Sequence, residues 1–243
     1  MGSTWYWSII MMRAKSLLSK LGILPYLRIL RLLADKERVP VAMMKFPTYD
    51  LNIHHSLAFV GDYFRYATIG LALQRILSDD IIGCLAEAGV YRGDISRFVH
   101  QLAPERVYYL FDTFEGFPRQ DLEPTVSEDN RFSDTTVKDV LQNIGDTRNI
   151  IIKKGYVPDT FQGLESEQFA FVLLDLDLYK PTLSSLGFFY PRLVKGGYLI
   201  VHDYNSRESN WACNRAVNEF MHDKTEKIIE IADEWGTVLF RKL

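Results

Sequence analysis

The chain has 243 residues, a hydrophobic fraction of 47% and a formal net charge of −3, which are ordinary values for a globular protein. Because there is no excess of positive charge, we expect no nucleic-acid partner. Two cysteines are too few for a disulfide framework or a cysteine metal site, and they fit a cytoplasmic location. No stretch approaches the roughly 18–20 apolar residues of a membrane-spanning helix.

The first third, residues 1–80, predicts a helical cap or lid rather than an independent domain. Leucines recur at three- and four-residue spacings between 14 and 33, and the segment 61–77 is periodic again. Aromatic and apolar residues at 5–12 precede the first positive charges, which is the reverse of a signal peptide. These residues could pack on the body or on a second subunit, so we expect a homo-oligomer. The alternative is a weak contact with a membrane surface.

From residue 81 the pattern changes to strands alternating with helices, which predicts a doubly wound α/β domain over 81–243. The expected strands are 82–90, 107–111, 150–153, 171–176 and 198–202, and the expected helices are 94–102, 135–144, 182–193 and 214–222. Two further segments, 228–232 and 237–241, flank a short turn and predict an antiparallel hairpin. The expected fold is therefore Rossmann-like, with a seven-stranded, mostly parallel sheet that ends in this hairpin.

The stretch 169–179 is the centre of this prediction. Six apolar residues from Phe169 to Leu174 are typical of a strand buried on both faces. The run ends in Asp175 and Asp177, and unpaired buried carboxylates are too costly to serve packing alone. The next strand ends at Asp203, after a turn at 195–197, so we expect Asp175 and Asp203 to meet at one edge of the sheet. Two carboxylates suit Mg²⁺, whereas the alternative is that Asp203 caps the next helix.

A second set of residues predicts a cofactor site at the same edge. Gly89 and Gly93 follow the first strand and free the backbone for a tight turn, and Glu87 could pair with the amino group of a zwitterionic ligand. Asp112 ends the second strand about 20 residues later, where an acid can bind a ribose diol; the alternative is a turn cap. A dinucleotide fingerprint would need a third glycine, which is missing. The other expected cofactor contacts are Tyr91, Thr113, Asp159 and Asp175.

These motifs together resemble the macrocin O-methyltransferase (TylF-type) family. The resemblance rests on Glu87 to Gly93, Phe111 to Phe117, Leu174 to Tyr179, and Gly196 to Tyr204. It implies a class I methyltransferase fold, S-adenosylmethionine as methyl donor, usually Mg²⁺, and a sugar or phenolic hydroxyl of a natural product as acceptor. It further implies that Glu87, Gly89 and Asp112 hold the cofactor, that Asp175 is a metal ligand and candidate base, and that Asp203 is a second ligand.

One position departs from the family pattern, which commonly has two adjacent acids where this chain has His202-Asp203. Imidazole is a poor ligand for Mg²⁺, but it suits softer divalent metals and is a good general base near neutral pH. His202 is therefore open to three interpretations: metal ligand, catalytic base or structural residue. The lid segment offers His54, Tyr63, Arg65 and Tyr66 as acceptor contacts.

We therefore expect an S-adenosylmethionine-dependent O-methyltransferase that acts on a hydroxyl of a small molecule, such as a sugar or a glycosylated natural product, with help from a divalent cation. One alternative is a nicotinamide-dependent Rossmann enzyme, which the broken glycine fingerprint and the closing hairpin disfavour. The other is a non-catalytic, membrane-associated scaffold that binds the cofactor. In such a scaffold the acids at the strand ends would have no purpose.

Overall fold

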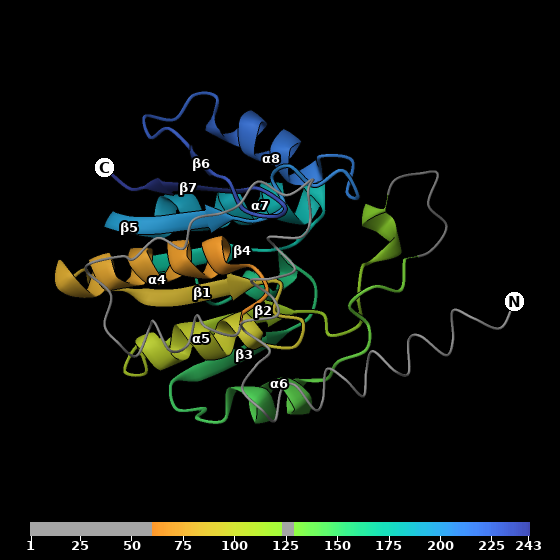
Figure 1. Ribbon diagram of the computed structural model, residues 1–243, viewed down its shortest axis with the longest axis horizontal. Helices are drawn as coiled ribbons and strands as arrows, with labels where there is room; N and C mark the ends of the chain where they lie inside the picture. Colours follow the sequence, from red (N-terminus) through yellow and green to blue (C-terminus); the bar gives the residue numbers. More distant parts are fainter. Residues whose placement is uncertain (1–59, 123–128) are drawn as a thin grey trace, which may run out of the picture. The chain divides into compact units, whose positions relative to one another are not determined.

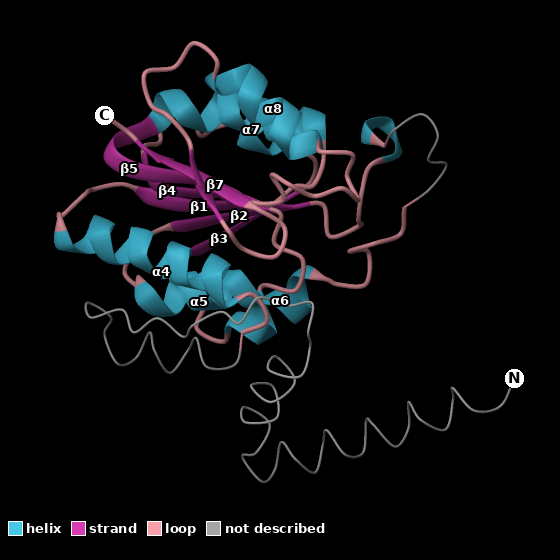
Figure 2. Cartoon of the chain, turned by 45° about the horizontal axis from the view of Figure 1, so that its top comes forward, coloured by secondary structure: helices cyan, strands magenta, loops and turns pink. Residues whose placement is uncertain are grey.

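The computed structural model describes residues 60–122 and 129–243, and these form a seven-stranded sheet with helices on both faces (Figures 1 and 2). The strands are β1 (Cys84–Ala88), β2 (Tyr108–Asp112), β3 (Ile150–Lys154), β4 (Phe169–Leu174), β5 (Leu193–Val201), β6 (Ile229–Ile231) and β7 (Thr237–Arg241). The helices are α4 (Tyr63–Ser78), α5 (Asp94–Leu102), α6 (Val137–Ile144), α7 (Tyr179–Phe189) and α8 (Ala212–Met221).

The order of the strands across the sheet is β3-β2-β1-β4-β5-β7-β6. The first five strands run parallel, and β7 is antiparallel to both β5 and β6. Figure 2 shows α4, α5 and α6 on one face of the sheet and α7 and α8 on the other. The predicted Rossmann-like fold with its C-terminal hairpin is confirmed.

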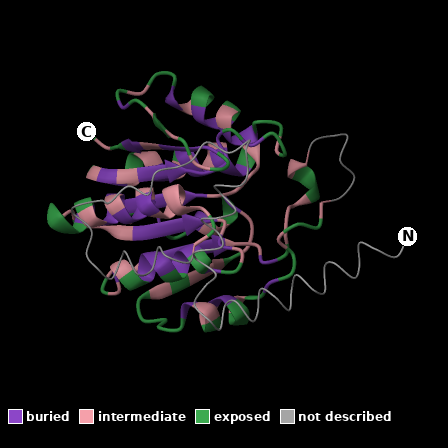
Figure 3. Cartoon of the chain, in the orientation of Figure 1, coloured by how far each residue is buried: buried purple, intermediate pink, exposed green. Residues whose placement is uncertain are grey.

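The strand β4 lies at the centre of the core, as its sequence predicts. All six of its residues are buried, and Figure 3 shows that burial is concentrated along the central strands. Toward α7 and α8, Val172 and Leu174 share a hydrophobic cluster with Phe189 and Val217. Burying one such side chain stabilises the fold by about 2 kcal/mol, so this layer holds the ends of β4 and β5 in place.

The start of β5 differs from the sequence prediction. The expected turn at 195–197 lies inside the strand, which begins at Leu193. Gly196 has a φ of 83°, and the pairing with β4 shifts between Leu193 and Tyr198, so the glycines form an irregularity in the strand. The preceding helix, expected at 182–193, consequently ends at Phe189.

Helix α4 belongs to the same compact unit as the sheet, Gly61–Leu243, and packs against β4, β5 and α5. The predicted boundary between a cap at 1–80 and a domain at 81–243 stays a prediction, because residues 1–59 lie outside the described part of the chain. Of the helices in the described part, none is both long and apolar enough to cross a membrane.

The turn after β1 passes very close to the end of β4. The Asp175 N–H donates a hydrogen bond to the Ala88 carbonyl oxygen (2.8 Å), and the Gly89 N–H donates one to the Phe111 carbonyl oxygen (2.9 Å). Gly89 has a φ of 90°, and a Cβ at this position would lie 1.8 Å from the Asp175 carbonyl oxygen. Only glycine fits this approach, which brings the cofactor turn beside the acids of β4.

We therefore expect Gly89→Ala to lower the free energy of unfolding by about 3 kcal/mol or more, because backbone strain and steric overlap add. Gly187→Ala is the matched control. Gly187 lies inside α7 with no atom within 4 Å of the added methyl group, so this change should be neutral or stabilise by up to about 1 kcal/mol. Urea unfolding followed by circular dichroism measures both variants, and equal effects would contradict the steric argument.

Candidate active site

A cleft of about 420 Å³ opens at the carboxyl ends of the parallel strands. Most of the site residues predicted from the sequence lie in its wall: Glu87, Gly89, Tyr91, Asp112, Thr113, Asp175, His202 and Asp203. Their meeting follows from topology, because parallel strands deliver their final residues to a single edge. The sheet thus brings the predicted cofactor residues and the predicted acids into one site.

Two predicted cofactor residues do not line this cleft. Gly93 lies at the start of α5, where a Cβ would come within 2.8 Å of the Val140 side chain, so its role in the structure is close helix packing. Asp159 opens a short 3₁₀ helix, η2 (Asp159–Phe161), and lies beside a separate groove with Arg192. From that loop, Gly155, Tyr156 and Val157 reach the cleft instead.

Asp112 holds the turn that follows β1. Its Oδ2 accepts hydrogen bonds from the N–H groups of Val90 (2.7 Å) and Tyr91 (2.9 Å), and its Oδ1 accepts one from the Phe114 N–H (2.7 Å). The neighbouring Thr113 hydroxyl donates to the Gly116 carbonyl oxygen (2.9 Å). An ionised carboxylate has about four acceptor positions, so Asp112 can order this loop and still accept a hydrogen bond from a ligand hydroxyl.

Glu87 lies at the floor of the cleft and is 1% exposed. Its Oε2 accepts hydrogen bonds from the Ser96 hydroxyl (2.8 Å) and from the Tyr108 hydroxyl. Burial raises the pKa of Glu87 to about 8, although both hydrogen bonds oppose this shift. A ligand ammonium group next to Glu87 would favour its charged form.

Asp175, which is half-buried, is the centre of a charge cluster. It forms an ion pair with Arg65, which α4 places over the cleft, and its Oδ1 lies 3.1 Å from the His202 Nδ1. The same ring nitrogen lies 2.9 Å from the Asp203 Oδ2. Arg65 and Tyr66 thus reach the cleft as the lid prediction proposed, whereas Tyr63 is not among the lining residues and His54 lies outside the described residues.

The protonation of this cluster follows from its charges. Burial alone would raise the pKa of Asp175, but the positive charges of Arg65 and His202 together hold it below its ordinary range. Burial opposes the charged form of His202, yet the Asp175 and Asp203 carboxylates raise its pKa to about 10. Burial and the charges of Asp203 and Asp175 raise the pKa of Asp177 well above normal. The two carboxylates thus favour the positively charged imidazole, and Asp175, His202 and Asp203 each offer a ligand atom within 4.8 Å of the other two.

Backbone strain marks the same strand ends. Asp177 and Asp203 both have a φ of 58°, in the left-handed region that non-glycine residues seldom adopt. Such a conformation costs on the order of 1 kcal/mol for each residue. Strain of this kind is concentrated at functional sites, because there the surrounding contacts can enforce it.

Sequence reasoning missed the outer wall of the cleft, which Arg131 and three aromatic residues form. The Arg131 guanidinium lies 5.3 Å from the ring centre of Phe117 and 5.9 Å from that of Phe132, and it forms ion pairs with Asp129 and Glu208. The third aromatic side chain of this wall is Trp235, from the loop between β6 and β7. The cation–aromatic pairs join residues 14 or fewer positions apart, but no sequence motif marks them.

The strand order and the position of the cleft define the class of protein, because this is the fold of S-adenosylmethionine-dependent methyltransferases. Known structures agree. The O-methyltransferase NovP superposes with a TM-score of 0.62 at 23% identity, covering 74% of this chain and 80% of that one. The calicheamicin methyltransferase CalS11 superposes with a TM-score of 0.59 at 21% identity, covering 89% of this chain and 91% of that one.

Sequence comparison identifies the family. The macrocin-O-methyltransferase (TylF) family model matches residues 54–242, so the chain belongs to this family and is an O-methyltransferase. The mycinamicin III 3''-O-methyltransferase of Micromonospora griseorubida is 28% identical over 179 residues, which are 65% of this chain and 69% of that protein. A tetracenomycin-C 4'-O-methyltransferase of Streptomyces olivaceus is 28% identical over 172 residues, which are 64% of each chain. The resemblance found in the sequence is confirmed.

The raised pKa of Glu87 predicts a specific pH dependence of stability. Between pH 4.5 and about 8 the folded protein keeps a proton that the unfolded chain releases, so Glu87 makes folding less favourable as the pH rises. Glu87→Gln removes this contribution. Its free energy of unfolding relative to wild type should rise by about 1 kcal/mol per pH unit between pH 5 and 7. Urea unfolding at several pH values in this range measures the difference in unfolding free energy between the variant and the wild type. Glu230→Gln, at an exposed site, is the control. If the unfolding free energies of wild type and Glu87→Gln change with pH in parallel, the prediction is refuted.

Proposed function

We propose that this enzyme transfers a methyl group from S-adenosylmethionine to a sugar hydroxyl of a glycosylated natural product, with assistance from a divalent cation. One observation carries the proposal: a single cleft holds a cofactor turn on one side and a buried acid cluster on the other, in a chain of the macrocin O-methyltransferase family. The two named relatives methylate a 3'' position and a 4' position, the latter on a rhamnosyl compound, which supports a sugar as the acceptor.

The cofactor would lie along the ends of β1 and β2. Asp112 would accept a hydrogen bond from a ribose hydroxyl at its remaining acceptor position, and Glu87 would face the ammonium group of the methionine part, which favours its charged form. Gly89 leaves the backbone open on the cofactor side. This arrangement would direct the sulfonium methyl toward Asp175.

Asp175 is our candidate for the group that binds the acceptor hydroxyl. Because Arg65 and His202 keep Asp175 ionised, its carboxylate can accept a hydrogen bond from the hydroxyl and hold the oxygen in line with the methyl carbon. Bound S-adenosylmethionine would supply the methyl group, with its carbon–sulfur bond breaking as the oxygen–carbon bond forms. The hydroxyl proton leaves on the carboxylate.

The acid cluster fits a divalent cation. Asp175 and Asp203 are oxygen donors of the kind that Mg²⁺ prefers, and the charge of Asp175 adds to the effect of burial in raising the pKa of Asp203. A bound cation would relieve this repulsion and lower the pKa of the acceptor hydroxyl. We leave His202 out of this ligand set, because its Nδ1 already bridges Asp175 and Asp203.

Substitutions at two acids should separate binding from catalysis. Asp112→Ala should weaken binding of S-adenosylhomocysteine, measured by calorimetry, at least about 10-fold, because the ribose loses its acceptor. Asp175→Asn should keep this affinity but lower turnover by about 100-fold or more. Asp159→Asn, on the separate groove, should change neither quantity. Turnover near the wild-type rate in Asp175→Asn would rule out its role, provided that circular dichroism shows a folded variant.

The acceptor class is tested with methyl-labelled S-adenosylmethionine and matched pairs of acceptors. We expect transfer to a rhamnosyl-tetracenomycin acceptor of the kind that the Streptomyces olivaceus relative is named for, and none to the corresponding aglycone or to a simple catechol. Labelling of the catechol alone would contradict the sugar acceptor but not methyl transfer itself.

In the same assay, chelation of divalent cations should lower the rate at least about 10-fold, and added Mg²⁺ should restore it. An unchanged rate would refute the assistance by a cation.

A further inference from the structure

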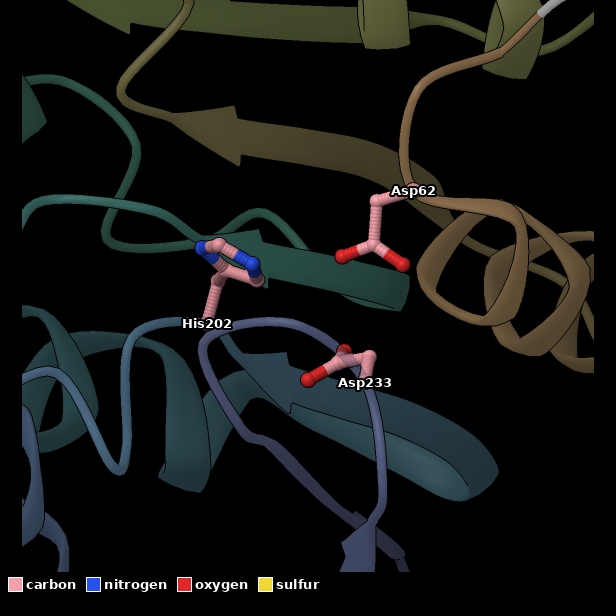
Figure 4. Close-up of side chains that lie close together, drawn as sticks. All are labelled: Asp62, His202 and Asp233. Carbon is pink, nitrogen blue, oxygen red and sulfur yellow. The ribbon is translucent and has the colours of Figure 1, made fainter. Parts of the chain in front are cut away.

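A second pair of carboxylates faces the opposite side of the His202 ring. Asp62 lies just before α4, and Asp233 lies in the loop between β6 and β7. Figure 4 shows the three side chains pointing toward one another. One ligand atom from each of the three residues lies within 4.8 Å of the other two. Three distant segments of the chain therefore deliver a nitrogen and two carboxylates to one point.

His202 is buried, Asp62 and Asp233 are half-buried, and the atoms of these groups that face one another are short of partners. His202 is 3% exposed, and neither its Nε2 nor the Asp62 Oδ2 has a hydrogen-bond partner among the described residues. The other Asp62 oxygen caps α4 by accepting the Arg65 N–H (3.2 Å). Leaving a buried polar group unpaired costs about 1–3 kcal/mol, so a bound group at this point would be stabilising.

Asp233 also lacks hydrogen-bond partners. Neither of its carboxylate oxygens has one among the described residues. Two carboxyl groups beside an unpartnered imidazole nitrogen form a place where a cation would be favourable.

The other ring nitrogen strengthens the argument. A histidine that binds a metal almost always donates its second N–H to a carboxylate or a carbonyl, which fixes the ring and its tautomer. In His202 the Nδ1 lies 2.9 Å from Asp203 and 3.1 Å from Asp175. The ring is therefore oriented as in a metal-binding histidine, with Nε2 directed at Asp62 and Asp233.

We propose that the Nε2 of His202 and the carboxylates of Asp62 and Asp233 bind a divalent transition metal such as Zn²⁺. One nitrogen and two oxygen ligands favour such a metal over Mg²⁺, which takes oxygen ligands. The site is separate from Asp175 and Asp203 and does not depend on the identity of the methyl acceptor. The metal would tie the start of α4 and the β6–β7 loop to the end of β5. It would also leave His202 with a single proton, on Nδ1, directed at the acid cluster.

The test is calorimetric titration of the metal-free, full-length protein with Zn²⁺ in the presence of excess Mg²⁺, which occupies oxygen-only sites. We expect one Zn²⁺ per chain. Asp62→Asn and Asp233→Asn should each weaken binding at least about 10-fold. Asp80→Asn, an exposed carboxylate just beyond the other end of α4, is the matched control and should bind as wild type does. Asp62→Asn remains informative about the site, because asparagine caps a helix as well as aspartate does.

Three results would overturn the proposal. The first is no Zn²⁺ binding by the wild-type protein, and the second is equal weakening by Asp80→Asn. The third is binding that survives both substitutions but is lost in Asp203→Asn, because this would place the metal in the acid cluster. Binding of S-adenosylhomocysteine by each variant, measured in parallel, shows that its fold is intact and keeps this result independent of the proposed acceptor.

Discussion

The half-buried carboxylate of Asp175 is the constraint on which this edge of the sheet depends. A carboxylate moved out of water costs several kcal/mol unless opposite charges and hydrogen bonds compensate. Arg65 from α4 and His202 from the end of β5 are these partners, so the charge of one residue fixes three elements relative to one another. Because removing one partner of a buried pair generally costs about 3–5 kcal/mol, electrostatics as well as packing holds α4 over the cleft.

The side of the cleft formed by the ends of β1 and β2 is held by backbone hydrogen bonds rather than by ion pairs. The Asp112 carboxylate accepts hydrogen bonds from the N–H groups of Val90 and Tyr91. The turn at Gly89 lies directly against the backbone of Asp175. The two halves of the site therefore meet at one short contact. Because Gly89 has no side chain, this contact fixes the distance between the turn after β1 and the end of β4.

Local patterns in the sequence were sufficient to predict most of the fold. The predicted helix at 94–102 and the predicted strand at 237–241 have their observed bounds, because apolar periodicity and flanking turn residues indicate where each element begins and ends. The start of β5 was not predictable, since Gly196 suggests a turn until pairing with β4 keeps it in the sheet. The site was predictable where it depends on strand ends. The pairing of Arg65 with Asp175 spans 110 positions, and no local pattern encodes it.

The departure from the family pattern at His202 now has a physical explanation. A carboxylate at this position would meet like charges on both sides: Asp175 and Asp203 on one, Asp62 and Asp233 on the other. An imidazole has two nitrogens and can serve both pairs at once. Whatever binds Nε2, a proton or a metal, sets the charge of the ring and therefore how strongly Nδ1 holds the acid cluster. The two acid pairs are thus coupled through one side chain, and a change of charge at Nε2 reaches the pair of carboxylates beside Nδ1.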